Sequence, residues 1–176
     1  MNKSKTIGFT LIELLVVIVL IGTLAGLVLF AINPLEQIAR SHDASRKTSI
    51  SQVGRAIQNY MVFNSTYPSP PNLQTSLTNT SDLNPFPSNP PGIVNSCSST
   101  SGQGARNING YCYNVSAEGS YPYAAIIYSQ LESAIESKNC PNKIAWYVWS
   151  SEVGGAGIVC TDSVVQEPSE TISGFN

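Results

Sequence analysis

Charged side chains are scarce in this sequence. Only 11% of its 176 residues are Asp, Glu, Lys or Arg, whereas roughly 25% is usual in a soluble globular domain. The formal net charge is -2, so the chain has no overall positive field and gives no strong signal of nucleic-acid binding. Its length fits one domain, or one domain with an appendage.

Residues that bind metals or pair as nucleophile and base are scarce too. His42 is the only histidine, and no C-x-x-C pair is present, so a zinc site is disfavoured. The second half of the chain has no histidine, no G-x-S-x-G pattern and no cysteine beside a plausible base. We therefore expect no enzyme activity: no catalytic residue, no metal site and no bound cofactor.

One long apolar segment is present. Residues 9–32 contain a single charge, Glu13, and residues 14–32 contain none. A helix of about 20 such residues crosses the ~30 Å hydrocarbon core of a bilayer. Lys3 and Lys5 precede the segment, which predicts a single-pass protein with a cytoplasmic N-terminus and an extracytoplasmic C-terminus.

A secretory signal peptide is the alternative explanation of this segment. Such a peptide has an apolar stretch of about 7–15 residues, followed by a small-residue cleavage site. Thr23-Leu24-Ala25 could serve as that site, but apolar sequence resumes directly behind it. A membrane anchor is therefore favoured.

Four cysteines all fall in the second half of the chain: Cys97, Cys112, Cys140 and Cys160. An even number behind an export signal predicts two disulfides in an oxidising compartment, with free thiols as the alternative. Four cysteines allow three connectivities. We favour Cys97–Cys112 and Cys140–Cys160, because each of these pairs joins a loop to a nearby strand.

The residues that open the apolar segment are Gly8-Phe9-Thr10-Leu11-Ile12-Glu13-Leu14-Leu15-Val16-Val17-Ile18. They resemble the class III leader junction of type IV pilins and of the pseudopilins of type II secretion and DNA uptake. The resemblance covers about the first 68 residues. It implies that a leader, residues 1–8, is cleaved after Gly8, that the new N-terminus Phe9 is methylated, and that Glu13 acts in assembly.

Glu13 is the residue that needs an explanation, because a carboxylate in a membrane helix is unfavourable and indicates a function by default. The simpler interpretation is a helix cap: Thr10 and Glu13 fit the capping-box pattern, with Phe9 and Leu14 placed as a hydrophobic staple. The functional interpretation is that cleavage exposes an amine on Phe9, which pairs with Glu13 of a neighbouring subunit. We favour the assembly role.

A second, amphipathic helical half follows the apolar one. Pro34 predicts a kink or a melted turn, so residues 9–62 should form one interrupted helix. Its first half, 9–32, is a membrane span or filament core, and its second half, 33–62, is half buried in a head domain. The cluster 43–47 is expected to be a solvated face, with salt bridges between subunits as the alternative. The expected buried stripe is Ile50, Val53, Ile57 and Tyr60.

The remaining residues, 63–176, are expected to form an extracytoplasmic head. Residues 64–110 hold most of the chain's eleven prolines and predict a long connecting loop, anchored by Leu73, Leu77, Leu83 and Phe86. A short helix is expected at 131–138. The strand candidates are 111–116, 121–128, 143–150 and 158–160, the first two joined by a hairpin at 117–120. The fold class is α+β: a long N-terminal helix packed on a small antiparallel sheet of three or four strands, as in pilins.

Three further patterns in the head have ordinary explanations. The aromatic residues could stack bases or sugars, but strand alternation favours the core for Tyr121, Tyr123, Tyr128, Trp146, Tyr147 and Trp149. Polar composition often generates N-x-[ST] patterns such as those at Asn64, Asn79 and Asn114. Calcium binding has weak support, because no ligand-loop spacing fits Asp162, Glu167 and Glu170.

The favoured function is structural: a pilin or pseudopilin subunit of a type IV pilus-like filament. The resemblance implies these partners: a prepilin peptidase and methyltransferase, further copies of the chain, an inner-membrane assembly platform and minor pilins. Two rivals remain. One is a binding module or adhesin at a filament tip, and the other is an enzyme held outside the cell by a signal anchor.

Overall fold

The computed structural model describes residues 8–80, 83–95, 97, 105–118 and 121–162, except for the side chains of Phe30 and of residues 116–123. The chain divides into two compact units, Met1–Gln37 and Ile38–Asn176. Helix α2, Pro34–Asn64, begins in the first unit and runs through the second.

Helix α1, Leu11–Ala31, dominates the first unit and is apolar on every side. Glu13 is its only charged residue. The large apolar side chains described in α1 are all exposed, between 44% and 81%. Its segment Leu11–Leu29 is long and apolar enough to cross a membrane. A helix of this composition is suited to surroundings of lipid or of other apolar helices.

The helix break expected at Pro34 is present, and capping residues define it. Ile32 is extended, and its N–H still donates to Val28 O at 3.0 Å. The Asn33 side chain then accepts from the backbone N–H of Glu36 at 3.4 Å. Pro34 occupies the first helical position of α2, where a missing N–H costs nothing. The chain therefore stops one helix and starts another within two residues.

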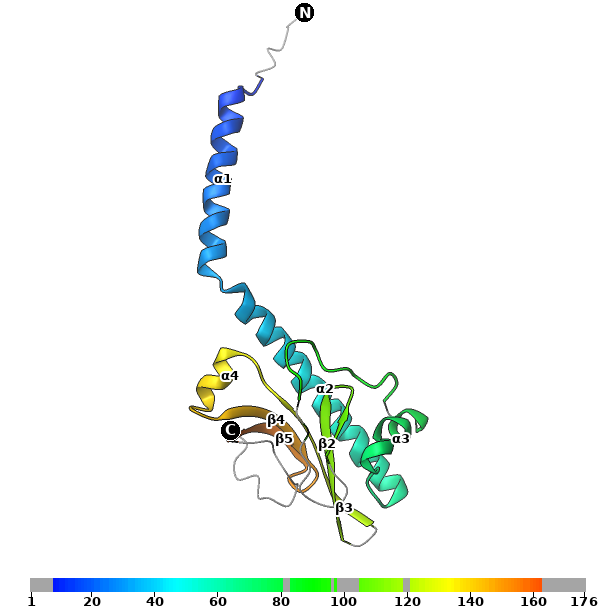
Figure 1. Ribbon diagram of the computed structural model, residues 1–176. Coiled ribbons are helices and arrows are strands. Elements are labelled where there is room, and N and C mark those ends of the chain that lie inside the picture. Colours follow the sequence, from blue (N-terminus) through cyan, green and yellow to red (C-terminus); the bar gives the residue numbers. More distant parts are fainter. Residues whose placement is uncertain (1–7, 81–82, 96, 98–104, 119–120, 163–176) are drawn as a thin grey trace, which may run out of the picture. The chain divides into compact units, whose positions relative to one another are not determined.

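The antiparallel sheet of the second unit has five strands, rather than the three or four expected. Their spatial order is β1-β2-β3-β4-β5, so each strand pairs with its neighbour in sequence (Figure 1). The additional strand, β1, lies in the region expected to be loop. The bounds are β1 Arg106–Ile108, β2 Tyr111–Glu118, β3 Tyr121–Gln130, β4 Ile144–Ser150 and β5 Gly155–Thr161.

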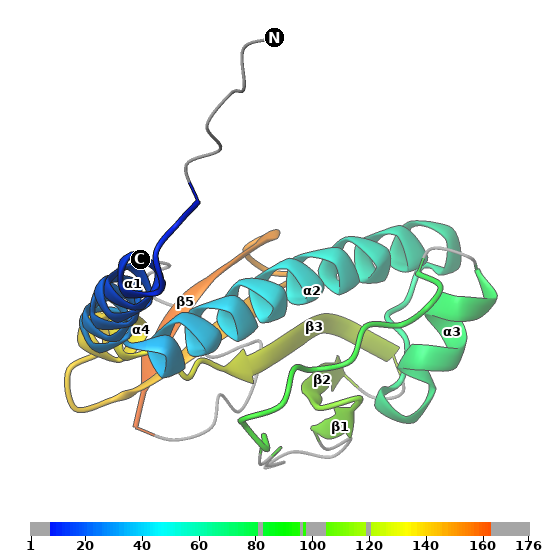
Figure 2. The ribbon, with the colours of Figure 1, turned by 90° about the horizontal axis from the view of Figure 1, so that it is seen from above.

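Helix α2 packs along one face of this sheet (Figures 1 and 2), which we call the inner face. Ile50, Val53 and Ile57 are completely buried, as the stripe predicted, and Tyr60 is partly buried. They form one core with alternate strand residues, because side chains on a strand point to opposite faces in turn. The sheet residues in this core are Tyr111, Tyr113, Val115, Ala125, Ile127 and Trp149.

The connection 64–110 contains more regular structure than expected. A 3-10 turn η1, Pro70–Asn72, leads into helix α3, Leu73–Asn79. Three of the four predicted anchors, Leu73, Leu77 and Phe86, are buried in the inner-face core, and Leu83 packs against it. A further short helix, α4, covers Ala134–Asn139 within the predicted 131–138 region and one residue beyond it.

The expectation of a solvated face at 43–47 is wrong for Asp43 and Arg46, whose exposures are 2% and 0%. Arg46 Nη1 donates to Asp43 Oδ1 at 2.8 Å, and Arg46 Nη2 donates to Pro91 O at 3.0 Å. Asp43 also accepts from the backbone N–H of Ser133 at 2.8 Å, just before α4. Pro91 and Ser133 are far from α2 in sequence, so the Asp43–Arg46 pair ties α2 to two separate loops.

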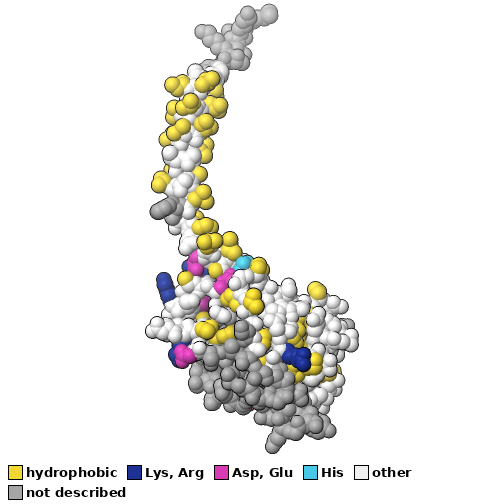
Figure 3. Space-filling model, viewed as in Figure 1, with side chains coloured by type: hydrophobic (Ala, Val, Ile, Leu, Met, Phe, Trp, Pro, Cys, Tyr) yellow, Lys and Arg dark blue, Asp and Glu magenta, His cyan; other side chains and the backbone are white. Residues whose placement is uncertain are grey.

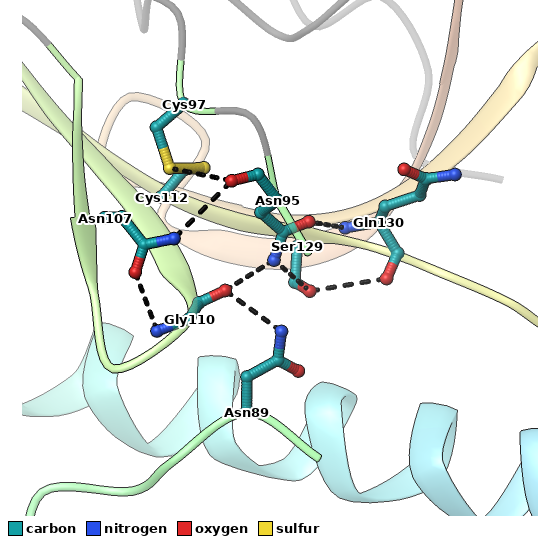
Figure 4. The surroundings of a disulfide bond; sticks show 8 residues. All are labelled: Asn89, Asn95, Cys97, Asn107, Gly110, Cys112, Ser129 and Gln130. Atoms are coloured by element: carbon teal, nitrogen blue, oxygen red, sulfur yellow. Dashed lines mark hydrogen bonds between the residues drawn. A yellow bond between two sulfur atoms is a disulfide. The ribbon is translucent and has the colours of Figure 1, made fainter. Parts of the chain in front are cut away.

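Both disulfides have the favoured pairing, Cys97–Cys112 and Cys140–Cys160. Beside the first, the Asn95 side chain takes part in a hydrogen-bond network (Figure 4). Its amide nitrogen donates to Gly110 O at 2.5 Å, in the turn between β1 and β2. Its oxygen accepts from the N–H of Gln130 at 3.0 Å, at the end of β3. The segment before the disulfide is thus held against the sheet.

Candidate functional site

The candidate site is the start of α1, where Thr10 is the N-cap. The Glu13 N–H donates to Thr10 Oγ1 at 3.3 Å, while Glu13 Oε2 accepts from the Thr10 backbone N–H at 2.9 Å. Thr10 Oγ1–H also donates to Glu13 Oε2, at 2.9 Å. The predicted capping box is therefore present. It holds the Glu13 carboxylate against the first turn of the helix.

Gly8 and Phe9 lie immediately before this cap, outside the helix and exposed. A Cβ added to Gly8 would meet no atom within 4 Å, so packing within the described chain does not require a glycine. An extended backbone without a side chain is, however, what a protease needs for close approach to a peptide bond. The Gly8–Phe9 bond is accessible to such an enzyme.

The surroundings of the carboxylate are apolar. Glu13 shares a shallow surface groove with Phe9, Ile12, Val16 and Val17, and hydrophobic side chains cover the rest of α1 (Figure 3). Once lipid or other chains surround this helix, the carboxylate lies in a medium of low dielectric constant, where a counter-charge is strongly attracted. Cleavage after Gly8 would create one such counter-charge, the α-amine of Phe9.

Comparison with known proteins identifies this segment. Residues 3–29 match the family model described as the prokaryotic N-terminal methylation motif. This motif is the class III leader of type IV pilins and pseudopilins. No curated protein and no solved structure gives a significant match to the chain.

The methylation motif covers Gly8, Phe9 and Glu13, the three processing and assembly residues proposed from the sequence. It implies processing by a prepilin peptidase and assembly in the manner of pilins in general. Together with the apolar helix α1, it fits a membrane-anchored, pilin-like protein whose anchor is N-terminal. The α+β fold, with a long helix on an antiparallel sheet, agrees with this.

The other candidate residues of the sequence analysis lie in the second unit. Tyr128, Trp146 and Trp149 are buried, as expected for core aromatics, and Tyr147 is partly buried. The side chains of Tyr121 and Tyr123 are outside the described residues. Asn114 is 1% exposed, so the folded chain does not present it for glycosylation.

Calcium binding gains no support from the part of the chain that is described. Asp162 is exposed and lies 3.8 Å from Lys143 Nζ, while Glu167 and Glu170 fall outside the described residues. Within the described ranges, no group of three or more His, Cys, Asp and Glu residues is arranged to hold a metal ion.

Sequence reasoning missed the buried Asp43–Arg46 pair, which holds two loops against α2. One local signal was available: the two residues lie three apart on a helix, a spacing at which opposite charges meet. Burial could not be inferred from that spacing, because Pro91 and Ser133 supply the other hydrogen-bonding partners.

Proposed function

We propose that the chain is a structural, non-enzymatic subunit of a type IV pilus-like filament, a pilin or pseudopilin. It is assembled from the membrane after cleavage at Gly8 and methylation of Phe9. The single observation that carries the proposal is the position of Glu13. It is the only charge on α1 and lies on the first turn behind a bond that the methylation motif marks for cleavage.

The proposed chemistry explains why a carboxylate is kept on an apolar helix. Before cleavage, Glu13 is bonded only within its own turn, to Thr10 among the described contacts. After cleavage, the Phe9 amine of a neighbouring subunit neutralises it, and methylation leaves that amine positively charged. An uncompensated charge is costly in an apolar medium, so pairing favours the assembled state and sets the register between subunits.

The proposed topology follows from the charges around the anchor. The leader, which contains Lys3 and Lys5, is cytoplasmic, and the sheet-bearing unit lies outside the membrane. A prepilin peptidase and methyltransferase then act at the membrane surface. An inner-membrane assembly platform, minor pilins and further copies of the chain are the proposed partners in an extracellular or periplasmic filament.

The test compares two variants that separate the charge of Glu13 from its capping role. Glu13→Gln keeps the size and an oxygen that can accept from the Thr10 N–H, but removes the charge. Thr10→Ala removes the hydroxyl from the capping box and leaves the carboxylate. We expect Glu13→Gln to lower the yield of sheared filaments by about tenfold or more, as loss of one partner of a buried charge pair does, and Thr10→Ala to change it little.

Intact mass spectrometry supplies the control for processing. Wild type and both variants should lack residues 1–8 and carry a methyl group on Phe9. A wild-type filament protein that begins at Met1, or that is cut near Ala25, would contradict the proposal. So would equal filament loss in the two variants, because Glu13 would then act only as a helix cap.

A further inference from the structure

The sheet has a second face, opposite α2, which we call the outer face. Its side chains come from the strand positions that alternate with those of the inner-face core. Tyr128 pairs with Val148 across β3 and β4, and Trp146 pairs with Val159 across β4 and β5. The buried outer-face cluster is Cys112, Ile126, Tyr128, Trp146 and Val148, each 2% exposed or less.

No described helix accounts for this burial. The buried apolar residues of α2 and α3 all belong to the inner-face core. Among the described residues, the partly buried hydrophobic side chains that pack against the outer-face cluster are those of Cys97, Ile144 and Val159. A five-residue apolar surface that is almost completely buried needs a cover, and the described elements leave most of that cover unassigned.

Polar atoms on this face also indicate what covers it. The Tyr128 hydroxyl, the Trp146 indole N–H and the Ser150 hydroxyl are buried without a hydrogen-bond partner. All three lie on the outer face, since Ser150 pairs with Ile126. Each is a donor, and buried donors are almost always satisfied. Peptide carbonyl groups of a chain segment laid across the face would satisfy them.

Strand β5 leaves room for such a segment. Gly157 pairs with Val148, and Gly155 pairs with Ser150, so both glycines fall on outer-face positions. Because glycine has no side chain, another backbone can approach this edge of the sheet closely at both positions. Gly157 is nonetheless buried, which again requires a cover there.

We propose that the C-terminal segment, residues 163–176, docks across the outer face of the sheet and covers this cluster. Only Asp162 separates it from the end of β5 at Thr161. Extended at about 3.3 Å per residue, it reaches roughly 45 Å, against roughly 20 Å for the width of five strands. It also offers an apolar set: Val164, Val165, Ile172 and Phe175.

The other stretches of the second unit outside the described ranges are poor candidates. Residues 98–104 read Ser-Ser-Thr-Ser-Gly-Gln-Gly, residue 96 is Ser, residues 119–120 are Gly-Ser, and residues 81–82 are Ser-Asp. None contains an apolar side chain, so none could replace the water removed from Trp146 and Val148. The side chains of Tyr121 and Tyr123 are also outside the described residues, but these residues belong to β3 itself. The C-terminal segment is therefore the separate stretch whose composition matches the surface.

The two tryptophans of the chain make a matched pair of reporters, because Trp146 is on the outer face and Trp149 on the inner face. The full chain in detergent is prepared as Trp149→Phe and as Trp146→Phe, each with and without residues 163–176. Removing the segment should raise acrylamide quenching of Trp146 several-fold and shift its emission to longer wavelength. Trp149 should not change.

A crosslinking measurement on the untruncated chain keeps the proposal testable if truncation unfolds the protein and exposes both reporters. A photoreactive benzoylphenylalanine replaces Phe175, and the control carries it at Phe63, which is 81% exposed at the end of α2. Position 175 should crosslink within the chain to peptides that contain Tyr128 or Trp146, and position 63 should not. Quenching of Trp146 that is unaffected by truncation overturns the proposal, as do crosslinks from 175 only to α2 or to a second chain.

Discussion

At the scale of single residues, Gly54 of α2 and Trp149 of β4 set how the helix lies on the inner face. A Cβ built on Gly54 would overlap three atoms of the Trp149 indole ring. Alanine favours a helix by about 1 kcal/mol over glycine, but forcing a methyl group into a packed core costs about 1–3 kcal/mol. The indole is buried in the inner-face core, so we expect the packing cost to dominate.

Gly54→Ala should therefore lower the free energy of unfolding by about 1–2 kcal/mol, against its helix propensity. Urea denaturation of the full chain in detergent measures this. Ser45→Ala, at an exposed position of the same helix, is the matched control and should stay within about 0.5 kcal/mol of wild type. A Gly54→Ala protein as stable as wild type would show that the ring can move away.

Three tyrosines of the sheet make the fold sensitive to alkaline pH. Burial raises the pKa of Tyr111 and Tyr113, and it raises the pKa of Tyr128 to about 12. In the unfolded chain each titrates near 10. Between pH 10 and 12 the unfolded state has lost the Tyr128 proton and the folded state keeps it, so stability should fall with rising pH by about 1.4 kcal/mol per pH unit from this residue. Below pH 10 this contribution is constant.

Absorbance titration of tyrosinate measures this effect directly. Tyr128→Phe should remove one residue from the class that ionises late, and it should make the loss of stability between pH 10 and 12 less steep. Tyr60→Phe, at a partly buried position, provides the comparison. A late-ionising class of the same size in Tyr128→Phe and wild type would contradict the assignment.

At the scale of elements, the break between α1 and α2 is specified by two neighbouring residues. Pro34 lacks the N–H that would continue α1, and Asn33 caps the new helix through Glu36. Gly22 and Gly26 lie inside α1, which is nonetheless continuous to Ala31. In the proposed filament, where lipid no longer requires every backbone group to bond within the helix, we expect unwinding within residues 22–34.

Pro34→Ala should stiffen filaments without preventing their assembly, because it restores one backbone donor and removes the clash of the proline ring. The double variant Asn33→Ala/Pro34→Ala removes the cap as well and should stiffen the filaments further. Asn33→Ala alone retains the proline and is the control for loss of the cap. Force–extension measurements on single filaments compare the three. Continuous helical density from Leu14 through Tyr60 in a filament map would contradict the expected unwinding.

Elements with a local signal could be predicted from the sequence, and those fixed by distant partners could not. The capping box and the α2 stripe are local, and both are present. The Asn109-Gly110 turn between β1 and β2 also had a local signal, since both residues have positive φ, 49° and 90°, and this dipeptide is typical of tight hairpins. The prolines of residues 64–110 favoured a loop there instead. The burial of Arg46 had no local signal, because loops far along the chain supply its partners.

At the scale of the whole molecule, the two disulfides hold the sheet-bearing unit together at two separate places. Cys112 belongs to the outer-face cluster, whereas Cys140 packs with Leu131 and Ala145. The linked cysteines are 15 and 20 residues apart. In the chain-entropy model, loops of these sizes contribute about 3 kcal/mol each, nearly equally because the dependence on length is logarithmic. Domains of this kind are stable by only about 5–15 kcal/mol in total.

Removing either pair, Cys97→Ala/Cys112→Ala or Cys140→Ala/Cys160→Ala, should therefore cost about 3 kcal/mol of unfolding free energy. The two losses should add, because the pairs lie in different clusters without shared partners. A chain without all four cysteines should be close to unfolding at 37 °C, and so should the wild type under reductant. Denaturant unfolding of the full chain, with and without reductant, measures all of these losses.

If reduction changed the free energy of unfolding by less than about 1 kcal/mol, the unit could fold in the reducing cytoplasm. That result would contradict the expectation that this unit depends on disulfides formed in an oxidising compartment.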